Sequence, residues 1–227
     1  MSQEEIVFQE VDEQLEAEQL SRFLRRHGSW VLAGLVLFFA GLASYVAWND
    51  YRLKRDQAAS DLFLSASQAV AEKRWEAAQD ELKKLVTTYP GHGYVALSHL
   101  LLARALVESG RSGDALRELE LLATESGEKN PLSDAALMEA AWIAADIDAN
   151  QARGYLSKIG ADSVFRAMAL ELDGVLTLHA GDKGKALTQF RQALEPRLSP
   201  PEGARQRLLR RVERLGGPVP ADGKQEG

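Results

Sequence analysis

AMALELDGVLTLHAGDKGKALTQFRQA, residues 167–193, carries two helical patterns on either side of a tight turn. Apolar residues recur three and four positions apart before and after Gly181-Asp182, which is the spacing of one face of an α-helix. Gly174 on the first helix and Ala186 on the second are small enough to let two antiparallel helices approach, and Phe190 is large enough to fill the space beside them. Asp173 stands where an apolar residue is expected. The segment predicts an antiparallel helix pair.

The same pattern recurs along the chain. Its second-helix alanines are spaced by 37, 37 and 34 residues: Ala78, Ala115, Ala152 and Ala186. This is close to the period of about 34 residues of tetratricopeptide repeats. The first, second and fourth units begin at Ala59, Ala96 and Ala167. The third is the poorest match, because Glu139 takes an apolar position and its second helix is short.

We therefore predict an all-α repeat solenoid over residues 50–215. A single helix pair cannot bury its apolar face, so the units must stack. An arginine-rich segment after Pro200-Pro201, Glu202–Leu215, predicts a last helix that closes the exposed end. Residues 216–227 contain Gly, Pro and charged residues and are predicted to be disordered.

A second feature lies near the N-terminus. The run WVLAGLVLFFAGLASYVAW, Trp30–Trp48, contains no ionisable side chain except Tyr45. Its length as a helix, roughly 28 Å, is close to the ~30 Å hydrocarbon core of a bilayer. The two tryptophans at its ends suit the membrane interfaces. We predict one transmembrane helix over residues 29–49. The alternative is a cleaved signal peptide ending near Gly41-Leu42-Ala43, but the polar segment before the run is long and the apolar character continues to Trp48.

The flanking charges do not decide the orientation. Three arginines precede the run and three basic residues follow it: Arg22, Arg25, Arg26, Arg52, Lys54 and Arg55. A short tail with arginines before an apolar run is the layout of a signal-anchor. Residues 1–28 are thus predicted to be an acidic cytoplasmic tail, with the repeats on the other side of the membrane. Gly34 and Gly41 share one helical face, which favours close packing with another membrane helix.

Composition and motifs exclude several classes of function. The 227 residues carry a net charge of −6, which argues against a nucleic-acid partner. The absence of cysteine excludes disulfides, thiol catalysis and Cys-based zinc sites. The four histidines are scattered, and Gly181–Lys185 lacks the glycine and hydroxyl residues of a phosphate-binding loop. We expect no catalytic residues, no cofactor and no metal.

A stacked array of helix pairs forms a groove lined by the first helices, and such grooves bind peptide segments. The residues that face it are predicted to be mostly apolar: Phe63, Leu100, Leu137 and Glu171, with Arg104 nearby. An apolar groove suits unfolded clients or one helix of a partner. The alternative is that these side chains pack on the chain's own C-terminal helix or in a homodimer.

The chain opens with FQEVDEQL at residues 8–15, and RRHG at residues 25–28, one span and repeats of this length follow. In these features it resembles the bacterial YfgM-like family, the ancillary subunit of the SecYEG translocon. The resemblance implies a single-pass inner-membrane protein with a cytoplasmic N-terminus and a periplasmic repeat domain. It further implies that translocon subunits, periplasmic chaperones and unfolded exported chains are the partners, and it brings no catalytic residues. The alternatives are a membrane-tethered scaffold for another envelope complex and an enzyme with a hidden site.

Overall fold

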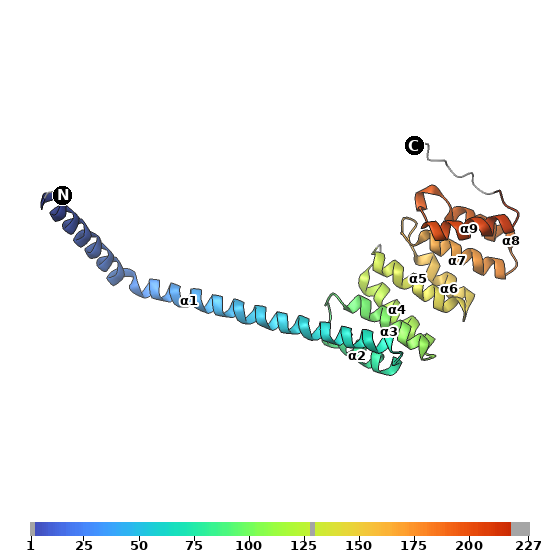
Figure 1. Cartoon of the computed structure of the whole chain (residues 1–227), viewed down its shortest axis with the longest axis horizontal. Helices are drawn as coiled ribbons and strands as arrows, with labels where there is room; N and C mark the ends of the chain where they lie inside the picture. The colour runs from blue at the N-terminus through green and yellow to red at the C-terminus, as the bar shows by residue number, and fades with distance from the viewer. Residues whose placement is uncertain (1–2, 128–129, 219–227) are drawn as a thin grey trace. The chain divides into compact units, whose positions relative to one another are not determined.

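The structure is a computed structural model that describes residues 3–127 and 130–218, and no strand occurs among them (Figure 1). The chain consists of two compact units, residues 1–57 and 58–227. The helices are α1 (Gln3–Ala71), α2 (Trp75–Thr88), α3 (Val95–Glu108), α4 (Ser112–Ser126), α5 (Pro131–Ala145), α6 (Ala149–Lys158), α7 (Arg166–His179), α8 (Lys183–Ala193), the 3₁₀ turn η1 (Pro196–Leu198) and α9 (Glu202–Arg214).

Helix α1 contains the predicted membrane span. Among the described residues it is the one helix long and apolar enough to cross a membrane, with a mean hydropathy of 1.6 over 18 residues. Every described side chain from Ser29 to Gln57 is exposed, including Trp30, at 78%, and Phe38, at 64%. The backbone of α1 continues through the boundaries predicted at residues 28 and 49.

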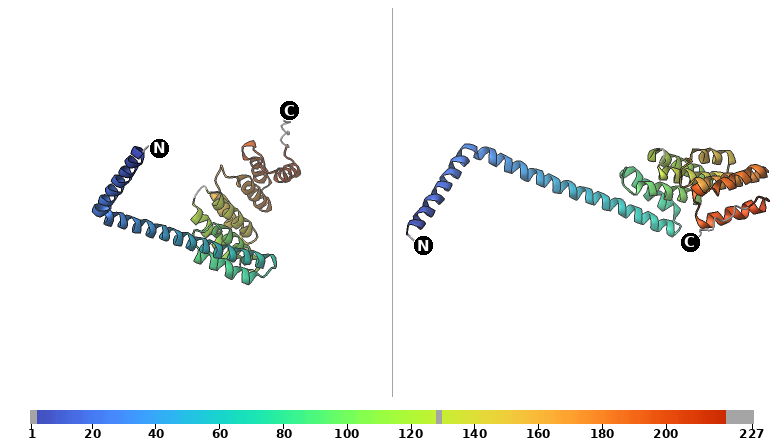
Figure 2. Two further views of the ribbon diagram at one scale, coloured as in Figure 1. Left: turned by 60° about the vertical axis from the view of Figure 1, so that its left-hand side comes forward. Right: turned by 90° about the horizontal axis from the view of Figure 1, so that it is seen from above.

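The second unit is a row of helix pairs. Residues 58–71 of α1 pair with α2, and the following pairs are α3 with α4, α5 with α6, and α7 with α8. Figures 1 and 2 show these pairs following one another in chain order, from the green α2–α4 to the orange α7–α9. This confirms the predicted all-α fold, in which repeated helix pairs follow one long apolar helix. Helix α6 has only 10 residues, as predicted for the third unit.

Small residues form the contact between the two helices of each pair. The alanines of the first three pairs at these positions are at most 1% exposed: Ala66, Ala78, Ala103, Ala115, Ala140 and Ala152. In the fourth pair Gly174 takes the first-helix position, and the buried Ala186 and Phe190 lie on α8. Because an alanine offers little bulk, the helix axes can approach while the neighbouring leucines fill the remaining space.

The core is continuous through the repeats and is closed by α9. One cluster of buried residues extends from Ala66 in α1 to Leu176 in α7, and a second joins α7, α8 and α9. Leu208 and Val212 of α9 are fully buried in the second cluster. Within the segment 216–227 that is predicted to be disordered, Gly216 and Gly217 follow the end of α9, and the Gly217 N–H donates to the Val212 carbonyl at 3.0 Å. Residues 219–227 lie outside the described part.

Candidate partner-binding groove

The predicted groove residues near the start of the array differ in what they contact. Phe63 of α1 stacks on Tyr94, with ring centroids 4.5 Å apart and planes nearly parallel. Leu100 of α3 is half-buried against the main core. Arg104, one turn further along α3, is exposed and pairs with Glu108 of its own helix at 2.7 Å. These positions offer aromatic and apolar surface, and Arg104 adds one positively charged side chain.

The last predicted groove position is occupied by the chain itself. Glu171 of α7 is 8% exposed, and its two carboxylate oxygens accept hydrogen bonds from Nε and Nη2 of Arg207, each at 3.2 Å. Arg211 Nε lies 3.6 Å from the same carboxylate. Hydrogen bonding to Glu171 raises the pKa of Arg207. Helix α9 therefore covers this end of the repeat array, as the alternative of self-packing anticipates for this one position.

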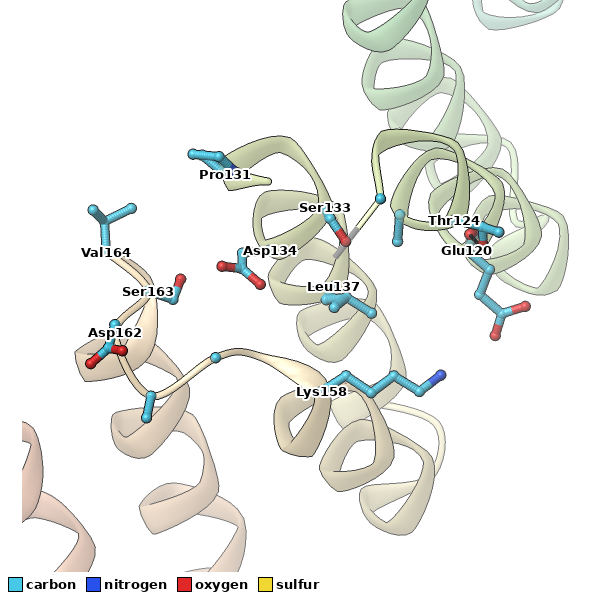
Figure 3. A pocket seen from close by; sticks show the side chains of 14 residues that line it. Glu120, Thr124, Pro131, Ser133, Asp134, Leu137, Lys158, Asp162, Ser163 and Val164 are labelled. Carbon is cyan, nitrogen blue, oxygen red and sulfur yellow. Dashed lines mark hydrogen bonds between the residues drawn. The ribbon is translucent and has the colours of Figure 1, made fainter. Parts of the chain in front are cut away.

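Leu137 of α5, the remaining predicted groove residue, lines a cavity of about 1130 Å³ (Figure 3). The cavity lies between the end of α4, the start of α5 and the segment that joins α6 to α7. Its lining is mixed and includes three carboxylates, from Glu120, Asp134 and Asp162, and one amine, from Lys158. The structure thus separates Leu137 from Phe63, Leu100 and Arg104, none of which lines this cavity.

Polar contacts connect successive helix pairs. The buried Gln79 of α2 donates from Nε2 to the Ala105 carbonyl at 3.3 Å and to Ser109 Oγ at 2.8 Å, and accepts from Arg111 at 3.2 Å. Further along, the Tyr155 hydroxyl of α6 donates to Glu120 Oε1 of α4 at 2.6 Å. Burial, and then this hydrogen bond, raise the pKa of Tyr155 to about 12. Such bonds fix the register between neighbouring repeats.

Two polar residues on the first helices of their pairs, Asp173 and His99, have polar partners. Asp173 of α7, at an expected apolar position, accepts hydrogen bonds from Arg153 of α6, at 3.3 Å, and from Gln189 of α8. His99 of α3 is fully buried, and its Nδ1 lies 3.0 Å from Glu118 of α4. Within the described part of the chain, no three His, Cys, Asp or Glu side chains gather in a way that would hold a metal ion.

The predicted membrane-packing residues lie on the exposed part of α1. A Cβ atom added at Gly34 or at Gly41 would meet no other atom within 4 Å. Ser44 Oγ donates to the Ala40 carbonyl at 2.8 Å, so its hydroxyl is satisfied within the helix. Both glycines are therefore free to pack against a helix of another chain.

Sequence reasoning missed the residues around the cavity. Glu120, Asp134 and Asp162 belong to three different segments, and no motif connects them. Packing of Glu171 on the C-terminal helix was one of the two alternatives, but its pairing with Arg207 was not predicted; the arginine-rich composition of Glu202–Leu215 was the available signal.

Comparisons with known proteins agree with this architecture. The family model described as tetratricopeptide repeat-like domain matches residues 21–212. A crystal structure of a tetratricopeptide repeat protein from Parabacteroides merdae is similar, with a TM-score of 0.54 over 70% of this chain at 15% identity. The match covers 64% of that protein, just under two thirds of its length, and it shows the fold alone. No curated protein matches the chain significantly. Tetratricopeptide arrays are in general non-catalytic modules that bind other proteins, and the match over residues 21–212 means that this chain belongs to the tetratricopeptide repeat-like domain family.

Proposed function

We propose that this protein is a membrane-anchored protein-binding module, in which residues 29–49 cross the bilayer and residues 50–215 bind partners on the far side. One observation carries the proposal: the family's repeat array continues from a helix whose described side chains are exposed throughout its apolar run. Tryptophan and phenylalanine side chains exposed along more than four helical turns are unfavourable in water and favourable in lipid. The repeats provide the binding surface, and the apolar helix holds that surface at the membrane.

The orientation that we propose is a cytoplasmic N-terminus and a periplasmic repeat domain at the bacterial inner membrane. The chain contains no cysteine, so single cysteines can be introduced without background. With Ser157→Cys on the exposed side of α6, a membrane-impermeant maleimide should label the protein in intact spheroplasts. With Ser2→Cys it should label only after lysis. The reverse pattern would overturn the orientation, and release of the wild-type protein by sodium carbonate would overturn the anchor.

For partners we propose translocon subunits, periplasmic chaperones and the unfolded chains that emerge between them. The sequence resemblance to the YfgM-like family supports this assignment, and the half-buried apolar positions Phe63 and Leu100 suit an extended apolar client. Gly34 and Gly41 leave one face of the span open to close helix packing. The protein would then hold emerging chains until a chaperone binds them.

Photo-crosslinking from the membrane span tests this assignment. Benzoylphenylalanine at Gly41 should give an adduct with a subunit of the translocon channel in gently isolated membranes, identified by mass. The same residue at Leu53, exposed and beyond the apolar run, is the matched control for a contact within the bilayer. An adduct with a different envelope protein in place of the channel would favour the alternative, a scaffold for another complex, and would leave the membrane-anchored binding module intact.

A further inference from the structure

Asp134 of α5 is an acid without a partner inside the cavity described above. It is 8% exposed, and its carboxylate has no hydrogen-bond or ion-pair partner among residues 3–127 and 130–218. In Figure 3 its side chain extends from α5 toward the segment that carries Asp162, Ser163 and Val164. A carboxylate that is mostly buried and has no donor on the protein favours a cation or hydrogen-bond donor that enters the cavity.

The charges around Asp134 have the same sign. Glu120 and Asp162 also line the cavity, and Lys158 is the one basic side chain among the described residues of its lining. The Lys158 amine does not neutralise Asp134, because it lies over the Tyr155 ring, 5.7 Å from the centroid, and points away from Asp134 (Figure 3). With three acids and one base, the cavity favours a positively charged group.

Apolar surface surrounds this charge. Leu137 forms part of the floor beside Asp134, and Pro131 and Val164 line the cavity from the two sides. Val164 is 77% exposed and adds apolar surface to the lining. A lysine or arginine side chain combines a charged end with an apolar stem of three or four methylene groups, and it matches both parts of this lining.

We propose that the cavity receives a lysine or arginine side chain of a bound protein segment, with Asp134 as its ion-pair partner and Asp162 and Glu120 at the rim. This rests on the proposed protein-binding function and adds the chemistry of the partner. The site gives the middle of the array a selectivity for positively charged side chains, which the apolar positions Phe63 and Leu100 lack. A neutral apolar client would leave Asp134 unpaired.

The test uses the full chain in lipid nanodiscs and two fluorescein-labelled peptides of Ser, Gly and Leu. One has a central lysine, and the other has norleucine, which keeps the stem and lacks the charge. Fluorescence anisotropy should show that the lysine peptide binds about ten-fold more tightly or better, as expected for a charged hydrogen bond. Asp134→Asn should remove this preference. Asp146→Asn, the same change at the exposed end of α5 outside the cavity, should preserve it.

Each outcome bears on the inference. Equal binding of the two peptides overturns the cation site and leaves protein binding standing. Failure of both peptides to bind also overturns it, while the crosslink from Gly41 still decides the proposed function. A lysine preference that survives Asp134→Asn shows that another group provides the selectivity. If circular dichroism shows that Asp134→Asn does not fold, Asp162→Asn in the exposed segment should reduce the preference by about two- to five-fold; an unchanged preference would then refute the site.

Discussion

At the residue scale, the turn inside the first, second and fourth repeats depends on one backbone conformation. Gly110 and Gly181 have φ values of +74° and +89°, and the next residue donates its N–H to a carbonyl five positions earlier. Lys73 takes the same place in the first repeat with φ of +56°. This bond satisfies the last carbonyls of the first helix and reverses the chain. Lysine has a Cβ atom that crowds the backbone in this conformation, whereas glycine does not.

Lys73→Gly should therefore stabilise the protein. The left-handed conformation costs a non-glycine residue roughly 1–2 kcal/mol, part of which is offset by the greater freedom of glycine in the unfolded chain, so we expect a gain of about 0.5–1 kcal/mol. Chemical denaturation in a constant detergent would measure it. Lys83→Gly, the same substitution inside α2, should cost about 1 kcal/mol. Loss of stability in both variants would show that the turn is not strained.

The raised pKa of Tyr155 predicts that the folded protein loses stability at alkaline pH. Its pKa in the folded protein is about 12, against 10.0 for the free side chain, because burial and the bond to Glu120 favour the neutral phenol. A group whose pKa rises on folding contributes fully below its unfolded value, so this contribution is intact below pH 10 and is lost as pH rises to 12. The shift corresponds to roughly 2–3 kcal/mol at most. Thermal unfolding between pH 9 and 12 should show a drop that Tyr155→Phe lacks; an equal drop in both would locate the effect elsewhere.

At the scale of the element, the fourth helix pair places an aromatic ring against a glycine. Gly174 stands where the first three pairs have alanine, and a Cβ atom built there would lie 2.5 Å from the ring of the fully buried Phe190. The aromatic ring on α8 thus occupies the volume that the missing methyl group leaves on α7. Glycine is tolerated inside this helix because the pair gains the burial of a phenylalanine.

Gly174→Ala should destabilise the protein, although alanine is the better helix former. Overpacking costs about 1–3 kcal/mol and the helix propensity returns up to about 1 kcal/mol, so the net loss should be about 1–2 kcal/mol. Gly154→Ala provides the control, because a Cβ on this exposed glycine of α6 meets nothing within 4 Å. It should stabilise by up to about 1 kcal/mol. Both values come from denaturant unfolding, and stabilisation by Gly174→Ala would refute the packing argument.

The sequence predicts the helix pairs because their contacts depend on the size of individual residues. Ala78 and Ala115 are spaced by the repeat period and are fully buried, because two helices approach closely only over a small residue. Glu171 shows the limit of this reasoning. Its position in the repeat predicts a groove-facing side chain, whereas its burial depends on Arg207, 36 residues later, which no periodicity connects to it.

The candidate site was predictable only in part for the same reason. Leu137 follows from its place in the repeat, and it does line the cavity. Asp134 stands near the start of the same helix and looks like an ordinary acid in a first turn, where it complements the helix dipole. Only the position of the segment around Asp162 makes it a buried charge, and that position depends on the packing of α5, α6 and α7.

At the scale of the whole molecule, the two units differ in whether their apolar side chains are buried or exposed. The second unit buries its apolar residues within its own helix pairs, and α9 covers the last pair with Leu208 and Val212. In the first unit the leucine, valine and phenylalanine side chains from Leu32 to Val46 are exposed. We therefore expect the second unit to be stable in water by itself, and the apolar run of the first to require lipid or another helix. Helix α1 contributes to both units, so the proposed membrane span and the first helix of the first repeat belong to one uninterrupted helix.

Removal of the first unit should yield a soluble, folded repeat domain. A chain of residues 57–227 keeps the whole second unit, with its helix pairs and α9. In aqueous buffer it should sediment as one species, with a helical circular dichroism spectrum and a cooperative thermal transition. A chain of residues 29–227 keeps Trp30–Trp48 and should require detergent, because this run cannot be buried in the repeats. If 57–227 aggregates or lacks helix while 29–227 is soluble, the apolar run belongs to the core of the protein, and the division between a lipid-facing helix and a self-sufficient repeat array is wrong.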